Sequence, residues 1–132
     1  MTIQIRQTSF SSSQAVIRGH KITIDRPAEK GGTNLGPMGG ELFLASVGGC
    51  FMSNLLAAIN SRQAPVSDVQ TEVTATLDGT PPRFSQIELN VSADCSDRDL
   101  LEKLVEIAER GCIMVNTLRG KLDLKVRISL HA

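Results

Sequence analysis

The longest apolar segment of the chain runs over residues 41–61, and no charged side chain lies between Glu41 and Arg62. At 1.5 Å per residue, this segment is long enough for a helix of about 31 Å. When its residues are placed at 100° steps, Cys50 falls in one arc with five Ser and Asn side chains, and apolar side chains fill the rest of the circumference. The pattern predicts a buried central helix with one mildly polar stripe that carries Cys50.

Two other interpretations of this segment are open. An uncharged run of this length is long enough to span a bilayer, but its Ser and Asn residues oppose insertion. We therefore expect no membrane association. Cys50 is alternatively an inert core residue, because unpaired cysteines are among the most buried residue types.

Alternation of apolar and polar residues predicts strands on both sides of the central helix. Two early strands are joined by a turn at Arg18-Gly19-His20, and two later ones form an antiparallel hairpin with one solvated face. The predicted strands lie in residues 2–10, 14–26, 68–77, 87–93 and 122–130. We expect the sheets to be antiparallel.

Two helices are predicted before the last strand. Ser96 is expected to be the N-cap of the first of them, and Gly111 its C-cap. A short helix over residues 113–119 would place Cys112 at its start, where free backbone N–H groups lower a thiol pKa. The order βββ, α, ββ, αα, β predicts one α+β domain over residues 1–132.

The central helix also predicts a partner. A helix that is apolar over most of its circumference needs cover on several sides, and one half-solvated sheet covers only one of them. We therefore expect a homodimer whose subunits wrap the two central helices together. The glycine-rich segment 28–40 leads into this helix and forms either a flexible connection or a lid over a pocket.

Composition excludes several function classes. The 14 basic and 14 acidic residues balance and form no like-charged run, so nucleic-acid binding is not predicted. The N-terminal residues lack the pattern of a secretory signal, so a cytoplasmic protein is expected. Cys50, Cys95 and Cys112 have no metal-ligand spacing, so we predict neither a metal site nor a cofactor. Cys95 is interpreted as structural.

Two motifs resemble the OsmC/Ohr family of osmotically inducible and organic hydroperoxide resistance proteins. Residues 31–50, GGTNLGPMGGELFLASVGGC, resemble the family signature GGxNxGPxPxELLLAxxGGC. Residues 108–118, AERGCIMVNTL, resemble the later motif AxxCPVxxTL. The resemblance covers nearly the whole chain. It implies an OsmC-like fold in which antiparallel sheets wrap around a central buried helix in an intertwined homodimer.

The resemblance also implies an enzyme, a thiol-dependent peroxidase that reduces organic hydroperoxides in oxidative stress defence. Cys50 would attack the peroxide and become a sulfenic acid. Cys112 would then form a disulfide with it, and an external dithiol of the lipoyl type would reduce that disulfide. The family activates its attacking thiol with a carboxylate and an arginine, for which Glu41, Arg18 and Arg26 are the candidates here.

The same resemblance predicts an apolar substrate pocket, because the leaving group is an organic alkoxide. Phe43, Phe51 and Met52 are the candidates to line it. Gly40 occupies the position of the carboxylate in the peroxidase branches, and Glu41 follows one residue later. The alternative function is therefore an OsmC-like redox-sensing or small-molecule-binding protein without peroxidase activity.

Overall fold

The computed structural model describes residues 1–131, and its elements follow the predicted order of strands and helices. The α+β class is therefore confirmed. The chain divides into two compact units, Met1–Phe43 and Leu44–Ala132. Helix α1 (Gly39–Ser61) begins in the first unit and continues through the second.

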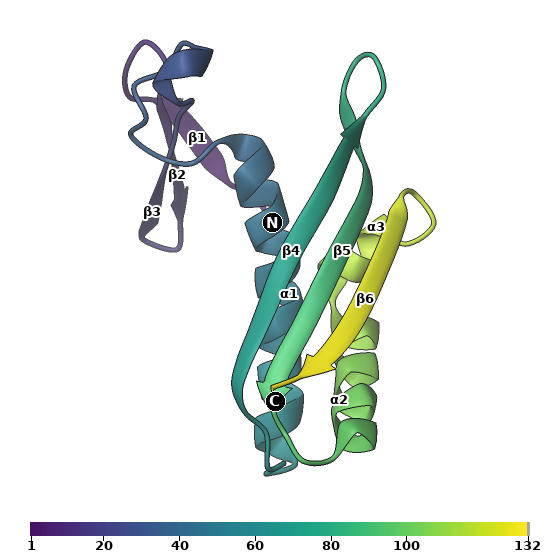
Figure 1. The fold of residues 1–132 in the computed structure, drawn as a ribbon. Coiled ribbons are helices and arrows are strands. Elements are labelled where there is room, and N and C mark those ends of the chain that lie inside the picture. Colours follow the sequence, from purple (N-terminus) through teal and green to yellow (C-terminus); the bar gives the residue numbers. More distant parts are fainter. Residues whose placement is uncertain (132) are drawn as a thin grey trace. The chain divides into compact units, whose positions relative to one another are not determined.

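The first unit contains a three-stranded antiparallel sheet in the order β1-β2-β3 (Figure 1). Its strands are β1 (Gln4–Gln7), β2 (Ser13–Ile17) and β3 (His20–Ile24), and a 3₁₀ turn η1 (Ala28–Lys30) follows. The predicted turn at residues 18–20 joins β2 to β3. Arg18 and Gly19 both adopt left-handed backbone angles there, with φ of 48° and 83°.

The glycine-rich segment after β3 is held in place by Asp25, whose side chain is only 2% exposed. Its carboxylate accepts the Thr33 hydroxyl at 2.7 Å and the backbone N–H groups of Arg26, Thr33 and Leu35 at 2.7, 3.2 and 3.1 Å. The hydrogen bond from the Thr33 side chain and those from the backbone outweigh burial and hold the Asp25 pKa well below its usual range. One buried carboxylate therefore fixes the loop.

The second unit contains a mixed sheet in the order β4-β5-β6. Its elements are β4 (Ser67–Asp78), β5 (Arg83–Asp94), α2 (Arg98–Gly111), α3 (Ile113–Leu118) and β6 (Asp123–Leu130). Strands β4 and β5 pair in the antiparallel sense, as predicted. Strand β6 pairs with β5 in the parallel sense, which corrects the expected antiparallel arrangement. The reason is that α2 and α3 form a crossover, which brings the chain back to the end of the sheet where β5 began.

The core of this second unit lies on one face of the sheet, where α1 and α2 pack (Figure 1). The inward side chains of β5 are completely buried and alternate with partly exposed outward ones. Gly48 lets α1 approach β4, because a Cβ at that position would lie 2.6 Å from Val73 Cγ2. The fully buried side chains are Val47, Phe51, Leu55, Ile87, Leu89, Val91, Ala93, Leu101, Ala108, Cys112 and Val115.

Three helix ends differ from the predictions. The N-cap of α2 is Asp97 rather than Ser96, since the Asp97 carboxylate accepts the Leu100 backbone N–H at 3.1 Å. Gly111 is the last residue of α2, and Cys112 follows it as both the C-cap of α2 and the N-cap of α3. Helix α1 begins at Gly39, two residues earlier than its apolar run.

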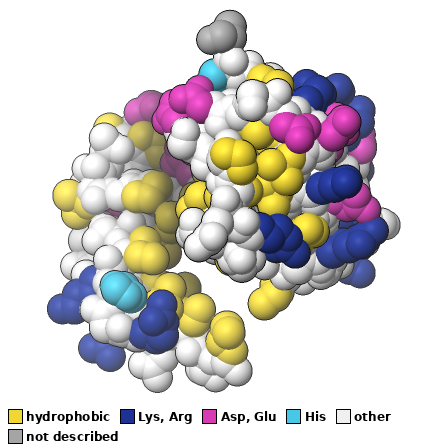
Figure 2. Space-filling view, turned by 90° about the horizontal axis from the view of Figure 1, so that it is seen from below, with side chains coloured by type: hydrophobic (Ala, Val, Ile, Leu, Met, Phe, Trp, Pro, Cys, Tyr) yellow, Lys and Arg dark blue, Asp and Glu magenta, His cyan; other side chains and the backbone are white. Residues whose placement is uncertain are grey.

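Helix α1 is long and apolar enough to cross a membrane, and here it serves as the core helix of an α+β unit. Within the chain, only 33% of its most apolar window is buried. Leu56, for example, is 42% exposed. Figure 2 shows other hydrophobic side chains at the surface, among acidic and basic ones. The burial predicted for α1 is therefore incomplete within one copy of the chain.

Candidate functional site: a pair of cysteines

The fold brings Cys50 and Cys112 together, although they are 62 positions apart in the sequence. Cys50 lies in the middle of α1, and Cys112 lies at the junction of α2 and α3. Their side chains form a hydrogen bond. Cys112 is completely buried and Cys50 is partly exposed. Of these two thiols, only Cys50 is therefore accessible to a reagent in solvent.

Close packing of α1 against the end of α2 brings the two thiols into contact. The Asn54 side chain donates to the Cys50 backbone carbonyl at 2.9 Å, one turn along α1. A Cβ at Gly111 would lie 2.9 Å from Asn54 Oδ1, so a larger residue before Cys112 would require the Asn54 side chain to shift. The Asn116 backbone N–H donates to the Cys112 carbonyl at 3.0 Å and begins α3.

The pKa of the Cys50 thiol lies below its ordinary value. Burial opposes ionisation, but hydrogen bonds from the Met114 backbone N–H, the Cys112 side chain and the Ile113 backbone N–H outweigh it. The two amides belong to the first turn of α3, whose N–H groups have no partner within the helix. Cys50 therefore carries more thiolate at neutral pH than an ordinary cysteine.

The pKa of the Cys112 thiol moves in the opposite direction. Burial raises it, and so do the hydrogen bond to Cys50 and the Cys50 negative charge, despite hydrogen bonds from the Val115 and Met114 backbone N–H groups. The sequence predicts the start of α3 and its free amides correctly, and these amides contact both thiols. At Cys112 their effect on the pKa is outweighed by burial and by the neighbouring Cys50, whereas at Cys50 it prevails.

This pairing suits two-step thiol chemistry. The thiolate is the nucleophile in reactions of cysteine, and Cys50 combines thiolate character with partial exposure. Cys112 stays protonated beside it and is shielded from solvent. After oxidation, the Cys50 sulfur would therefore react with the Cys112 thiol before an external thiol reached it.

Glu41, Arg18 and Arg26 all belong to the first unit, Met1–Phe43. Glu41 lies in the first turn of α1, and its carboxylate accepts the Met38 backbone N–H at 2.9 Å. Arg18 is exposed in the β2–β3 turn, and Arg26 is exposed directly after Asp25. The three residues are therefore not part of the unit that contains both thiols, and their catalytic role stays a prediction.

The predicted pocket residues occupy different environments. Phe51 is completely buried in the core of the second unit, and the Met52 sulfur accepts the Thr71 hydroxyl at 3.8 Å. Phe43 is half-buried and is the last residue of the first unit. Their role as a pocket lining stays a prediction. Cys95 lies near the beginning of α2, where its Sγ donates to the Asp97 carbonyl, whereas Cys112 follows the end of that helix.

Sequence reasoning did not assign the groups that stabilise the Cys50 thiolate. Two of them are backbone amides, which carry no residue-type signal. The available signal was the short helix beginning after Cys112, which indicates free N–H groups without showing which sulfur they face. The sequence places Asn54 on the polar stripe of α1 but does not indicate its hydrogen bond to the Cys50 carbonyl.

The fold and the paired cysteines define an α+β protein whose second unit holds a thiol pair between its helices. The family model described as OsmC-like protein matches residues 31–127, which include both cysteines. The chain therefore belongs to the OsmC-like family, and the resemblance seen in the sequence is confirmed. No curated protein is significantly similar in sequence.

Solved structures share this fold over almost the whole chain. An OsmC-like protein from Mycoplasma pneumoniae has 19% identity and a TM-score of 0.85, and the match covers 99% of this chain and 96% of that one. An organic hydroperoxide resistance protein OsmC from Legionella pneumophila has 24% identity and a TM-score of 0.75, with 98% and 97% covered. The organic hydroperoxide resistance protein OhrB of Bacillus subtilis has 21% identity and a TM-score of 0.69, with 98% of each chain covered. At these identities the likeness shows the fold.

Proposed function

We propose that this protein is a thiol-dependent peroxidase that reduces organic hydroperoxides as part of oxidative stress defence. The observation that carries the proposal is the Cys50–Cys112 pair, in which hydrogen-bonded thiols have pKa values shifted in opposite directions. A nucleophilic thiolate next to a protonated partner thiol is the arrangement that peroxide reduction through a disulfide requires. Two of the structural relatives are described as organic hydroperoxide resistance proteins.

The chemistry proceeds in three balanced steps. The Cys50 thiolate attacks the outer oxygen of ROOH, the O–O bond breaks, and an alkoxide leaves and takes up a proton to become an alcohol. The resulting Cys50 sulfenic acid is attacked by the Cys112 sulfur, which gives a disulfide and water. An external dithiol then reduces this disulfide by thiol–disulfide exchange. Both protein thiols are restored, and the dithiol is released as its own disulfide.

The partners of this reaction follow from the same proposal. The substrate is an organic hydroperoxide rather than hydrogen peroxide, held in an apolar pocket to which Phe43, Phe51 and Met52 contribute. The reductant is a lipoyl-type dithiol, and the protein works in the cytoplasm. We assign Glu41 and either Arg18 or Arg26 as supports for the Cys50 thiolate. These three residues all lie in the unit that precedes the thiol pair.

The test is steady-state reduction of cumene hydroperoxide with dihydrolipoamide as the reductant. Cys50→Ser should abolish turnover, and Cys112→Ser should stop the cycle at the sulfenic acid. Cys95→Ser is the matched control, because Cys95 is the third free cysteine and should be dispensable. Turnover that survives in Cys50→Ser, or a wild-type rate no higher than that of free thiol, would contradict the proposal.

Redox sensing is the second candidate function, and one observation favours it. Among the described residues, the groups that lower the Cys50 pKa are hydrogen-bond donors, and none of them is an arginine or a lysine. A thiolate that is stabilised by neutral hydrogen-bond donors suits slow, stoichiometric oxidation better than rapid turnover. A sensor would consume one equivalent of hydroperoxide per chain and then stop, even with excess dihydrolipoamide, whereas the enzyme would continue.

A further inference from the structure

A second cluster of reactive side chains lies in the second unit, where β4 begins and β5 and β6 end. His131 Nδ1 lies 2.7 Å from Asp94 Oδ1 and 3.6 Å from Asp68 Oδ2. Its other ring nitrogen, Nε2, lies 3.1 Å from the Ser92 hydroxyl. The ligand atoms of the histidine and the two aspartates all lie within 4.8 Å of one another. No step proposed for the thiol pair uses these residues.

The sheet itself brings this cluster together. Asp94 is the last residue of β5, and the His131 backbone N–H donates to the Ala93 carbonyl at 3.1 Å directly after β6. Asp68 lies in a β-bulge, because the β4–β5 register shifts between Ser67 and Gln70. Bulges redirect side chains at the edges of sheets. The three ligand residues therefore lie at or directly beside the ends of three neighbouring strands.

The charge of the cluster is not balanced by protein groups. Over residues 1–131, the two aspartates form ion pairs with His131 and with no lysine or arginine. Even with a protonated imidazole, two carboxylates leave one excess negative charge. Such a site attracts a cation, and an imidazole nitrogen with carboxylate oxygens is a donor set for divalent transition metals.

We infer that His131, Asp94 and Asp68 bind a divalent first-row transition ion, with Zn²⁺ the best match. Metal–ligand distances of about 2.1 Å place tetrahedral donor atoms about 3.4 Å apart. The two Nδ1–carboxylate distances, 2.7 and 3.6 Å, lie on either side of that value. Small side-chain rotations therefore suffice to admit the ion, and water completes the fourth position.

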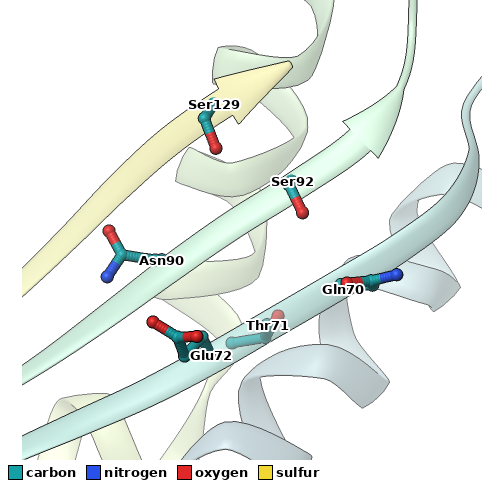
Figure 3. A pocket seen from close by; sticks show the side chains of 6 residues that line it. All are labelled: Gln70, Thr71, Glu72, Asn90, Ser92 and Ser129. Atoms are coloured by element: carbon teal, nitrogen blue, oxygen red, sulfur yellow. The ribbon is translucent and has the colours of Figure 1, made fainter. Parts of the chain in front are cut away.

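Ser92 is a positioning residue for this site. With the ion on His131 Nδ1, the opposite nitrogen carries its proton and donates to the Ser92 hydroxyl, which orients the ring. Ser92 also lines a polar cavity of about 380 Å³ on the outer face of the sheet, together with Gln70, Asn90 and Ser129 (Figure 3). The cavity therefore borders the site and leaves room for exchangeable water.

The Ser92–His131–Asp94 chain of contacts does not suit a serine nucleophile. An acyl-transfer site needs backbone N–H groups free to bind an oxyanion. Ser92 lies in the central strand of its sheet, paired with Gln70 on one side and Ser129 on the other. The backbone around it is therefore engaged in the sheet, and metal binding is the function that this geometry favours.

Zinc titration by calorimetry tests this inference, with metal-free, untagged full-length chain. We expect one Zn²⁺ per chain at this site, lost in His131→Ala and weakened at least about 10-fold in Asp68→Asn and Asp94→Asn. Ser92→Ala should weaken it by about 10-fold, the usual effect of losing a partner of a ligating histidine. His20→Ala is the matched control, since the sequence has two histidines.

Two further measurements separate this site from the cysteines. The imidazole NMR signals of His131 should shift on zinc addition while those of His20 stay unchanged. Co²⁺ bound at this site should give no thiolate charge-transfer absorption. Zinc binding that persists unchanged in folded His131→Ala, binding lost only in Cys50→Ser, or no binding at all would overturn the inference. If His131→Ala does not fold, the test uses Asp68→Asn, because Asp68 is exposed. An unchanged zinc affinity in that variant would overturn the inference as well.

Discussion

At the scale of single residues, the proposed chemistry depends on the difference between two thiols. Cys50 gains hydrogen bonds from the Ile113 and Met114 amides, and Cys112 is buried beside it. The sequence motifs predict that these two cysteines act together, and the structure places their side chains in contact. They do not predict which thiol is the more acidic, because backbone amides and burial decide it.

The rate of alkylation by iodoacetamide should reveal the acidity of Cys50. Because its pKa is lowered, the rate at Cys50 should rise with pH and level off below the range of an ordinary thiol. Cys112→Ala removes one of the hydrogen bonds to the thiolate and should move the midpoint upward. Peptide mass spectrometry separates Cys50 from Cys95. A midpoint at or above the ordinary thiol value in the wild type would contradict the assignment.

Asp25 is expected to stabilise the first unit in a pH-dependent way. Its pKa is lowered from an ordinary value of 3.8, so its contribution is fully present above pH 3.8 and is lost as the pH falls below that value. At neutral pH, Asp25→Asn should lower the urea midpoint, because an amide cannot accept all four hydrogen bonds. Amide exchange at Thr33 and Leu35 should increase as well.

The control for this prediction is Asp123→Asn, which removes an exposed ion pair with Lys125. Such pairs contribute about 0–1 kcal/mol, so its urea midpoint should stay close to that of the wild type. Equal stability of the two variants at pH 7 would show that Asp25 does not hold the loop.

At the scale of elements, the apolar and alternating patterns predict every strand and every α-helix in the right order. Their ends are less predictable, since Asp97 rather than Ser96 makes the capping hydrogen bond. The predicted antiparallel direction of β6 was also wrong. Alternation specifies which side chains of a strand are buried, but only the path of α2 and α3 determines that β6 runs parallel to β5.

The adjacent glycines of α1 provide a test of how this helix packs. Gly48→Ala should lower the free energy of unfolding by about 1–2 kcal/mol, because overpacking against Val73 exceeds the gain in helix propensity. Gly49→Ala is the control, since among residues 1–131 a Cβ there would meet no heavy atom within 4 Å apart from its chain neighbours and the backbone of its own helix. Denaturant unfolding measures both. A Gly48→Ala variant as stable as Gly49→Ala would contradict the packing of α1 on β4.

At the scale of the whole molecule, the incomplete burial of α1 supports the proposed homodimer. A helix without a charge between Glu41 and Arg62 has only 33% of its most apolar window buried within one chain. The sequence predicts that such a helix needs a partner surface, and one copy of the chain does not supply it. How the dimer is arranged is not encoded in any local pattern, because it depends on the complementarity of two folded surfaces.

A charged substitution on the exposed side of α1 should break this dimer. Leu56→Asp places a carboxylate where we expect an apolar interface, so sedimentation velocity should show a shift from dimer to monomer. Leu77→Asp is the matched control, because Leu77 is 65% exposed near the tip of the β4–β5 hairpin. A monomeric wild type, or a Leu56→Asp variant that stays dimeric, would contradict the proposal.

The most direct test of the account is to map the disulfide formed when the reduced protein meets one equivalent of cumene hydroperoxide. The account predicts rapid loss of two thiols per chain and a single disulfide between Cys50 and Cys112, with Cys95 still free. Peptide mass spectrometry under non-reducing conditions identifies the linked residues. A disulfide that involves Cys95, or thiol loss no faster than that of a free thiol in solution, would contradict it.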